Sequence, residues 1–319
     1  MTMQHTSVAA VQPRTELAET LPAAFQAVET LLVDAVDSEV AVLRDASRHI
    51  IAAGGKRFRP RLTLLAYAAV GGEDPNHAVP VAAAVELVHT ASVVHDDIND
   101  HGVVRRGRPS VNALFGRTFA LLTGDYLFTK VYELMAPYGD LNILLAEGTS
   151  ALVEGETLQA AAVKEGNFTR EVYYRVIALK TAALFKSAGA MGAKLAGGTT
   201  KQIDALANFG FNIGLAFQIV DDILDLIGDK EQLGKTAGLD LEQGRGFATA
   251  YAQEGAEPSL DDKVNAIKRK AMEGDALNQA RTQAHMLVQQ AINELEILPP
   301  SAAKDELANL AHMIVDRSF

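Results

Sequence analysis

The sequence predicts an all-α fold, and three observations support this class. Hydrophobic residues make up 48% of the 319 residues, but aromatic residues contribute only 6% and tryptophan is absent, which suits helices more than sheets. Apolar positions recur with helical spacing along most of the chain, as in Phe25, Val28, Leu32 and Val36. No segment shows a clean alternating strand pattern, and no glycine-rich nucleotide loop occurs.

The N-terminal half is expected to contain five helices after a disordered arm at residues 1–16, which are polar and irregular. Gly54-Gly55 is a natural helix end, and Gly71-Gly72 turns the chain before the fourth helix. A loop is expected at 102–109. The helices expected in this half are 22–36, 38–53, 61–69, 80–100 and 111–135.

The C-terminal half continues the helical pattern, with a surface loop at 252–260. Two Asp-Asp-x-x-Asp motifs, at 96–100 and 221–225, hint at an internal duplication, but their flanking sequences do not align well. Residues 17–319 are therefore interpreted as a single all-helical domain. The helices expected in this half are 141–163, 169–195, 200–229, 262–293 and 303–316.

Two copies of the pattern Asp-Asp-x-x-Asp stand at 96–100 and 221–225, each after an apolar run. Because positions i and i+4 share a helix face, the outer aspartates of each copy point the same way. A solvated helix face is the alternative, but carboxylates beside apolar residues carry a desolvation cost unless they are paired or metal-bound. Carboxylate oxygens suit Mg²⁺. We expect metal ligands at Asp96, Asp97, Asp100, Asp221, Asp222 and Asp225.

Positive charge is concentrated in two segments of an otherwise acidic chain. Residues 56–61 hold four cations, and Arg105-Arg106-Gly107-Arg108 follows the first acidic motif closely. Helix dipoles or surface charge could explain one or two of these residues, and Arg57 and Arg61 are interpreted as surface charge. Carboxylates, metal and arginines together can hold a diphosphate, and two basic groups leave room for two such substrates.

Composition also excludes several classes of function. The net charge of −11, without a strongly basic arm, argues against nucleic-acid binding. The absence of cysteine excludes disulfides, thiolate nucleophiles and zinc–thiolate sites. The N-terminus lacks the pattern of a secretory signal, and no uninterrupted apolar run reaches 18 residues, so we expect no transmembrane segment and a cytoplasmic protein.

Several motifs, taken in order, resemble the trans-isoprenyl diphosphate synthases, also called polyprenyl synthetases, and especially their medium- and long-chain members. The resemblance covers about residues 40 to 245. It implies an isoprenoid-synthase-like helical bundle around a central cavity, usually as a homodimer, and condensation of isopentenyl diphosphate with an allylic diphosphate. The matching segments are GGKRFRP (54–60), VELVHTASVVHDDIND (85–100), RRGRPSVN (105–112), LKTAALF (179–185), GLAFQIVDDILD (214–225) and GKTAGLD (234–240).

The resemblance also implies roles for individual residues. The six aspartates would hold about three Mg²⁺ from opposite walls of the cavity. Arg105, Lys180 and Lys235 would bind the allylic diphosphate, and Thr181 and Gln218 would stabilise the developing allylic cation. For Gln218 a simple packing role remains open, while Asp125, Glu154 and Glu156 are interpreted as structural or polar helix residues. Isopentenyl diphosphate would be bound by Lys56, Arg59, His89 and Arg106.

Product length is expected to depend on the residues that precede the first acidic motif. Five residues of helix span about 7.5 Å, so Ala91 and Ser92 would lie beside the first added units. Short-chain members commonly carry a bulky aromatic residue there, whereas both residues here are small. We expect a product of C20 or longer, a quinone side-chain precursor that passes to a membrane. The floor could instead be formed by Phe115, Phe119, Phe128 or Tyr132.

Three alternatives remain open at this stage. A terpene cyclase shares the first acidic motif, but its second metal motif usually mixes Asn, Ser or Thr with Glu. A farnesyl or geranylgeranyl diphosphate synthase would make a shorter product by the same chemistry. A non-catalytic partner subunit of a heteromeric synthase typically loses acidic or basic motifs that this chain retains.

The chain departs from the family pattern at two places. Members often have Asn where Leu239 stands here, and residues 246–248 replace a Thr-Leu-Pro run.

Overall fold

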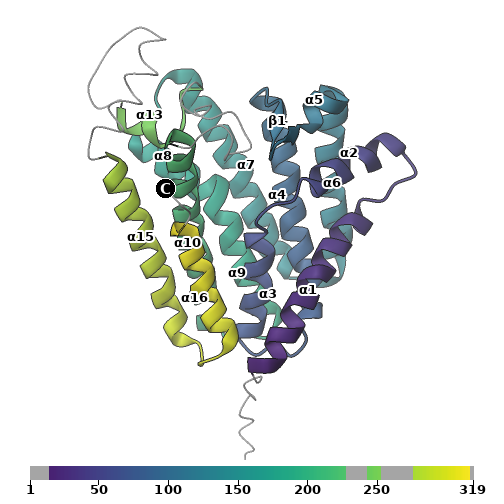
Figure 1. Cartoon of the computed structure of the whole chain (residues 1–319), viewed down its shortest axis with the longest axis vertical. Coiled ribbons are helices and arrows are strands. Elements are labelled where there is room, and N and C mark those ends of the chain that lie inside the picture. The colour runs from purple at the N-terminus through teal and green to yellow at the C-terminus, as the bar shows by residue number, and fades with distance from the viewer. Residues whose placement is uncertain (1–13, 228–242, 253–275, 317–319) are drawn as a thin grey trace, which may run out of the picture.

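The protein is a bundle of α-helices, as the sequence predicts (Figure 1). The computed structural model describes residues 14–227, 243–252 and 276–316. The first half contains α1 (Arg14–Ala35), α2 (Ala41–Ala52), α3 (Phe58–Ala69), η1 (Pro75–Ala78), α4 (Val79–Asn99), α5 (Val111–Phe115), α6 (Arg117–Met135) and η2 (Ala136–Tyr138). The second half contains α7 (Leu141–Glu165), α8 (Arg170–Ile177), η3 (Ala178–Ala182), α9 (Ala183–Leu195), α10 (Thr200–Ile227), α13 (Gly246–Ala252), α15 (Ala276–Glu294), η4 (Leu295–Ile297) and α16 (Ala302–Val315).

The observed elements differ from the expected ones at several places. The first helix begins at Arg14, inside the expected arm, while residues 1–13 lie outside the described part of the chain. The expected loop at 102–109 contains a short antiparallel hairpin of β1 (Val104–Arg105) and β2 (Arg108–Pro109). The helix expected at 111–135 is divided at Gly116, whose positive φ of 82° breaks the helical path. The helix expected at 262–293 is described only from Ala276.

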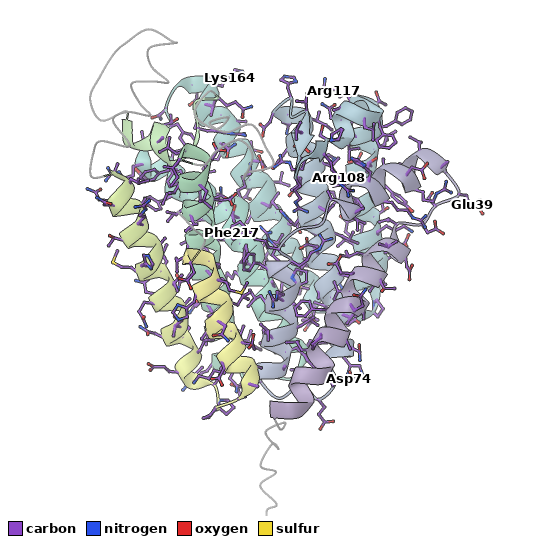
Figure 2. All side chains as sticks on the ribbon, in the orientation of Figure 1. Glu39, Asp74, Arg108, Arg117, Lys164 and Phe217 are labelled. Atoms are coloured by element: carbon purple, nitrogen blue, oxygen red, sulfur yellow. The ribbon has the colours of Figure 1, made fainter. Side chains whose placement is uncertain are left out.

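Helix α9 is the centre of the bundle and packs against α3, α7 and α10. Glycines allow this close approach, because a Cβ at Gly192 would collide with the carbonyl oxygen of Thr63 and one at Gly210 with that of Phe185. Phe217 of α10 lies in the interior, whereas charged side chains such as Glu39 and Lys164 lie on the outside (Figure 2).

The helix expected at 169–195 is interrupted by one π-helical turn, η3, which carries Lys180 and Thr181. Glycines on both neighbouring helices make room for it. A Cβ at Gly155 of α7 would lie 2.5 Å from the backbone nitrogen of Lys180, and a Cβ at Gly214 of α10 would lie 2.7 Å from Cα of Ala182. Single π-turns occur often at functional sites, because the extra residue redirects side chains.

Within the part of the chain that the structure describes, three helical stretches are long and apolar enough to cross a membrane by length and composition alone: 75–99, 170–195 and 200–227. This differs from the sequence expectation, which counted uninterrupted apolar runs. Between 56% and 78% of the three apolar windows is buried inside the protein. Packing within the bundle therefore provides a physical reason for their hydropathy.

Substitution of Gly155 tests the close packing around the π-turn. At an open helical site, Gly→Ala would raise the free energy of unfolding by up to about 1 kcal/mol. For Gly155→Ala we expect a decrease of about 1–3 kcal/mol instead, because the new methyl group overpacks the contact with Lys180. Chemical denaturation measures this change. Ala146→Gly, at an exposed position of α7, gives the propensity effect alone, and a stabilised Gly155→Ala protein would contradict the packing argument.

Candidate active site

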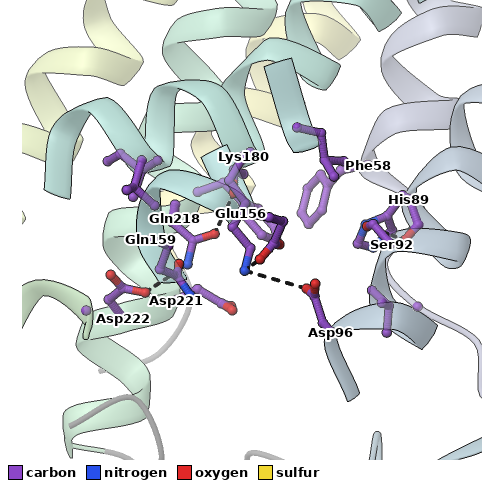
Figure 3. A pocket seen from close by; sticks show the side chains of 18 of the residues that line it. Phe58, His89, Ser92, Asp96, Glu156, Gln159, Lys180, Gln218, Asp221 and Asp222 are labelled. Atoms are coloured by element: carbon purple, nitrogen blue, oxygen red, sulfur yellow. Dashed lines mark hydrogen bonds and ion pairs between the residues drawn. The ribbon is translucent and has the colours of Figure 1, made fainter. Parts of the chain in front are cut away.

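One cavity of about 630 Å³ lies among α4, α7, η3 and α10, and the basic loop before α3 lines it at one end. Its wall contains residues far apart in sequence, including Asp96 on one side and Asp221 and Asp222 on the other (Figure 3). Both acidic motifs therefore contribute to a single chamber. The apolar part of the lining includes Phe58, Phe168, Tyr173, Val176 and Phe217.

The first acidic motif lies at the C-terminal end of α4. Asp96 and Asp100 both line the cavity, one helical turn apart, as their spacing predicts. Asp97 contacts Arg105 instead of lining the cavity. Its side chain is only 1% exposed and accepts a hydrogen bond of 2.9 Å from Nε of Arg105. Burial raises the pKa of Asp97, although the hydrogen bond and charge of Arg105 oppose this effect. Asp97 thus positions Arg105 at the edge of the cavity.

The two cavity-lining aspartates of α4 also face cations. Arg245, just before α13, donates two parallel hydrogen bonds of 2.7 Å to the two carboxylate oxygens of Asp100. Nζ of Lys180 lies 3.6 Å from Oδ2 of Asp96. Bidentate arginine–carboxylate pairs of this kind combine charge with geometric specificity. The sequence analysis missed Arg245, whose one signal was its position after the 234–240 motif.

The second acidic motif is tied to the π-turn through a chain of hydrogen bonds. The hydroxyl of Thr181 donates to Oε1 of Gln218 over 2.8 Å, and Nε2 of Gln218 donates to Oδ1 of Asp222 over 2.8 Å (Figure 3). Asp221 and Asp222 line the cavity, whereas Asp225 is 3% exposed and lies outside the lining. The chain orients the Gln218 amide, so Gln218 has more than a packing role.

Glu156, interpreted from the sequence as a polar helix residue, lines the cavity and pairs with Lys180. Its Oε1 lies 2.6 Å from Nζ of Lys180 (Figure 3). Burial and the charge of Asp96 raise the pKa of Glu156 to about 7, while Lys180 acts in the opposite direction. Burial lowers the pKa of Lys180, but the charges of Asp96 and Glu156 outweigh it and leave that pKa raised. Lys180 is therefore a cation held between two carboxyl groups.

The basic end of the cavity contains Lys56, Arg59, His89 and Arg106. Arg59 is 8% exposed and stacks 4.4 Å above the ring of Phe185, and burial lowers its pKa to about 10. Burial also lowers the pKa of His89 well below its ordinary value, and the charges of Arg59 and Arg106 add to this effect. His89 is therefore neutral at pH 7, where it can donate one N–H to an anion without adding to the charge.

The donor set fits a hard divalent cation. Carboxylate oxygens of Asp96, Asp100 and Asp221 face the cavity from two walls, and of the described lining residues only His89, at the basic end, carries an imidazole and none carries sulfur. Among the described residues, however, no three acidic or histidine side chains converge closely enough to hold an ion as they stand. Metal binding would therefore require the acidic side chains of the two walls to converge further than they do here.

The structure brings most of the predicted site residues into this one cavity and leaves a few elsewhere. Ser92 lines the cavity, but Ala91 is fully buried outside its lining. Phe119 and Tyr132 are 43% and 73% exposed, so they do not form an interior floor within this chain. Lys235 lies outside the described residues. The predicted residues found in the lining are Lys56, Arg59, His89, Ser92, Asp96, Asp100, Arg105, Arg106, Lys180, Thr181, Gln218, Asp221 and Asp222.

Comparison with known proteins identifies the family of this chain. The sequence profile of the polyprenyl synthetase family matches residues 40–284. The chain belongs to the polyprenyl synthetase family. It is 36% identical over 315 residues to the octaprenyl diphosphate synthase of Haemophilus influenzae, covering 92% of this chain and 94% of that protein.

Two further relatives show the range of the family. A short chain isoprenyl diphosphate synthase of Methanothermobacter thermautotrophicus is 39% identical over 291 residues, covering 85% of this chain and 89% of that protein. The crystal structure of a polyprenyl synthase from Caulobacter crescentus, complexed with calcium and isoprenyl diphosphate, superposes with a TM-score of 0.87 at 31% identity, covering 97% of this chain and 99% of that one. The chain is thus an all-α prenyltransferase of a metal-dependent family.

Proposed function

We propose that this enzyme condenses isopentenyl diphosphate with an allylic diphosphate, with Mg²⁺ as its metal, to give a polyprenyl diphosphate of C20 or longer. The observation that carries this proposal is the shared cavity, in which two acidic walls meet two basic clusters. One cluster lies beside the first acidic motif and the other lies around His89. The cavity therefore offers places for two anionic groups, one of them next to the proposed metal ligands.

The allylic diphosphate would lie between the two acidic walls. Asp96, Asp100 and Asp221 would hold about three Mg²⁺, with Asp97, Asp222 and Asp225 in supporting positions. When bound, these ions would neutralise the departing diphosphate and thereby promote ionisation of the allylic C–O bond. Lys180 already stands between the walls, and Arg105 is aimed at the same region by Asp97. Lys235 is expected to assist these two cations.

Thr181 and Gln218 would face the developing allylic cation. The amide oxygen of Gln218 accepts a hydrogen bond from Thr181 and its nitrogen donates to Asp222, which fixes the orientation of the amide dipole. A pre-oriented dipole stabilises charge without reorganisation during the reaction. These two residues therefore support the cation but do not take up a proton.

Isopentenyl diphosphate would be bound at the basic end by Lys56, Arg59, Arg106 and the neutral ring of His89. Its double bond would then attack the allylic cation, forming one C–C bond. The departed diphosphate would accept the proton that is lost to form the new double bond. This route balances charge and atoms without a protein base, and the apolar part of the cavity lining would limit attack by water.

Ser92 supports the proposed product length, because a small side chain lines the cavity one turn before Asp96. A quinone side chain of about C30 to C50 is the favoured length, by analogy with the octaprenyl relative, whereas the short-chain relative supports a C15 or C20 alternative. Such a product would pass from a cytoplasmic enzyme to a membrane.

A homodimer is the proposed assembly. Apolar side chains are exposed on three consecutive helices, α5, α6 and α7, where they would gain stability from burial against a second copy. The exposed fractions are 50% for Leu121 and 47% for Leu122 on α6, and 59% for Ile143 on α7.

The proposed reaction is tested by diphosphate release from purified protein with Mg²⁺, isopentenyl diphosphate and farnesyl diphosphate. A chelator should abolish turnover, and renewed Mg²⁺ should restore it. Asp221→Asn should lower kcat/KM by about 100-fold or more, because it removes a charge that holds the metal. Asp204→Asn, exposed on the same helix, is the matched control. Turnover only after addition of a partner protein would instead favour the non-catalytic subunit.

Chromatography of the products tests their length. We expect about C30 to C50. A terminal C20 product would contradict this favoured length, and a terminal C15 product would also contradict the proposed minimum of C20. Ser92→Phe should shorten the product by at least one isoprene unit, because the ring would enter the cavity beside the growing chain. Ala91→Phe tests whether the chain also passes the buried side of α4. Unchanged length in both variants would show that α4 does not line the product path.

Light scattering tests the assembly. We expect a mass twice that of the 34.0 kDa chain. Leu121→Lys should shift the protein toward the monomer, because a charge in an apolar contact must be desolvated. Val40→Lys, which introduces the same charge at another exposed apolar position, is the control. A monomeric wild-type protein, or a dimer unaffected by Leu121→Lys, would contradict the proposed interface.

A further inference from the structure

Arg57 is an internal residue of the basic loop and not the surface charge that the sequence indicated. Its side chain is only 10% exposed. Nε and Nη2 donate to the two carboxylate oxygens of Glu29 over 2.7 and 3.1 Å, and Nη1 donates to Oε1 of Glu86 over 2.8 Å. Nη2 also donates to the carbonyl oxygen of Ile51 over 3.2 Å. Arg57 therefore joins α1, α4 and the end of α2.

This network holds a backbone conformation that the chain would otherwise avoid. Arg57 has a φ of 49°, in the left-handed region that is unfavourable for residues with a Cβ, and it directly precedes α3. The preceding Gly54 and Gly55 also have positive φ values, of 71° and 154°. The sharp turn places Lys56 before Arg57 and Arg59 after it, both in the lining of the cavity. The position of these two cations thus depends on the conformation of Arg57.

The loop also contacts the other basic segment. A Cβ at Gly55 would lie 2.8 Å from Nη1 of Arg106, so the backbone of the loop rests on that guanidinium group. Glu86, only 3% exposed, is the buried counter-charge of this region. Its charge raises the pKa of Arg59 and Arg106 against the effect of burial, and so favours their charged forms. A change in the loop would therefore displace several of the cations that would bind one anionic ligand at the basic end.

The outer member of the network comes from α1, at the edge of the bundle. Glu29 is 41% exposed, so its replacement should leave the core intact. Its fork-to-fork contact with Arg57 is the kind of pair that fixes a guanidinium group in one orientation. Helix α1 contributes no residue to the cavity lining itself among the described residues. Any effect of Glu29 on the cavity must therefore pass through Arg57.

We propose that Glu29, Arg57 and Glu86 form a positioning network that fixes the basic loop for binding of isopentenyl diphosphate and makes α1 part of that subsite's support. This inference rests on the proposed function for the identity of the ligand. Arg57 itself lines the cavity, but it acts as a positioning residue, because its Nε, Nη1 and Nη2 groups are already engaged by Glu29, Glu86 and the carbonyl oxygen of Ile51. The network supports binding of the diphosphate at the basic end. It has little effect on binding at the allylic end, where Lys180 and Arg105 are the cations.

Calorimetric titration of the full chain tests the network without requiring turnover. Glu29→Gln should weaken binding of isopentenyl diphosphate on the order of tenfold, the value of a charge-assisted hydrogen bond, and leave the affinity for farnesyl diphosphate within about twofold. In an Arg57→Gln background, Glu29→Gln should cause no further loss, because the two residues act as a unit. Arg57→Lys should fail to restore binding, since an ammonium group cannot form both forked contacts.

Asp34→Asn removes the same charge from an exposed site on α1 and is the matched control. Equal losses for both ligands together with a lower melting temperature would reduce the network to a structural role and overturn the inference. Unchanged affinity in Glu29→Gln and Arg57→Gln would also overturn it. A wild-type protein that binds isopentenyl diphosphate but does not turn over would refute the proposed function alone, whereas one that does not bind it would refute both.

Discussion

Opposite charges face each other inside a largely apolar bundle, and the architecture of the site depends on their mutual stabilisation. A carboxylate such as Asp97, at 1% exposure, would be costly to bury alone, as would the guanidinium group of Arg59. Asp97 is accommodated because Arg105 pairs with it from the hairpin, whereas Arg59 stacks on the ring of Phe185 and is favoured by the charge of Glu86. Pairs of this kind hold α4, the hairpin, the π-turn and the segment before α13 around one chamber. Their charges would stabilise anionic substrates and metal ions bound in that chamber.

Small residues make this arrangement of charges possible. Gly155 and Gly214 allow α7 and α10 to approach the π-turn from two sides, and the turn in turn directs Lys180 toward Asp96 and Glu156. The hydrogen bonds from Thr181 through Gln218 to Asp222 then link this turn to the second acidic wall. Close backbone packing and polar contacts thus act together, because the glycines set the distance over which the side chains must reach.

Sequence reasoning predicted most of the site because local periodicity determines much of it. The i, i+4 spacing correctly placed Asp96 and Asp100 on one face at the C-terminal end of α4. The two cation-rich segments, 56–61 and 105–108, both contribute to the lining of one cavity, where Arg106 joins Lys56 and Arg59 at the same basic end. Arg57 is buried and paired, contrary to its interpretation as surface charge, and the contact of Glu156 with Lys180 was not predicted, because α1, α4 and η3 supply the surroundings of these residues. Neither residue carries a local signal, since a charged side chain on a helix or loop is usually solvated.

The sequence by itself determined the fold class, the helical order and the identity of the acidic and basic motifs, because these follow from composition, helical spacing and short contiguous patterns. Only the tertiary structure decided which carboxylate meets which cation. Arg245 pairs with Asp100, Arg57 with Glu29 and Glu86, and Lys180 with Glu156. Such pairs join residues up to 145 positions apart, and their choice depends on how helices approach each other in space, which no local pattern encodes.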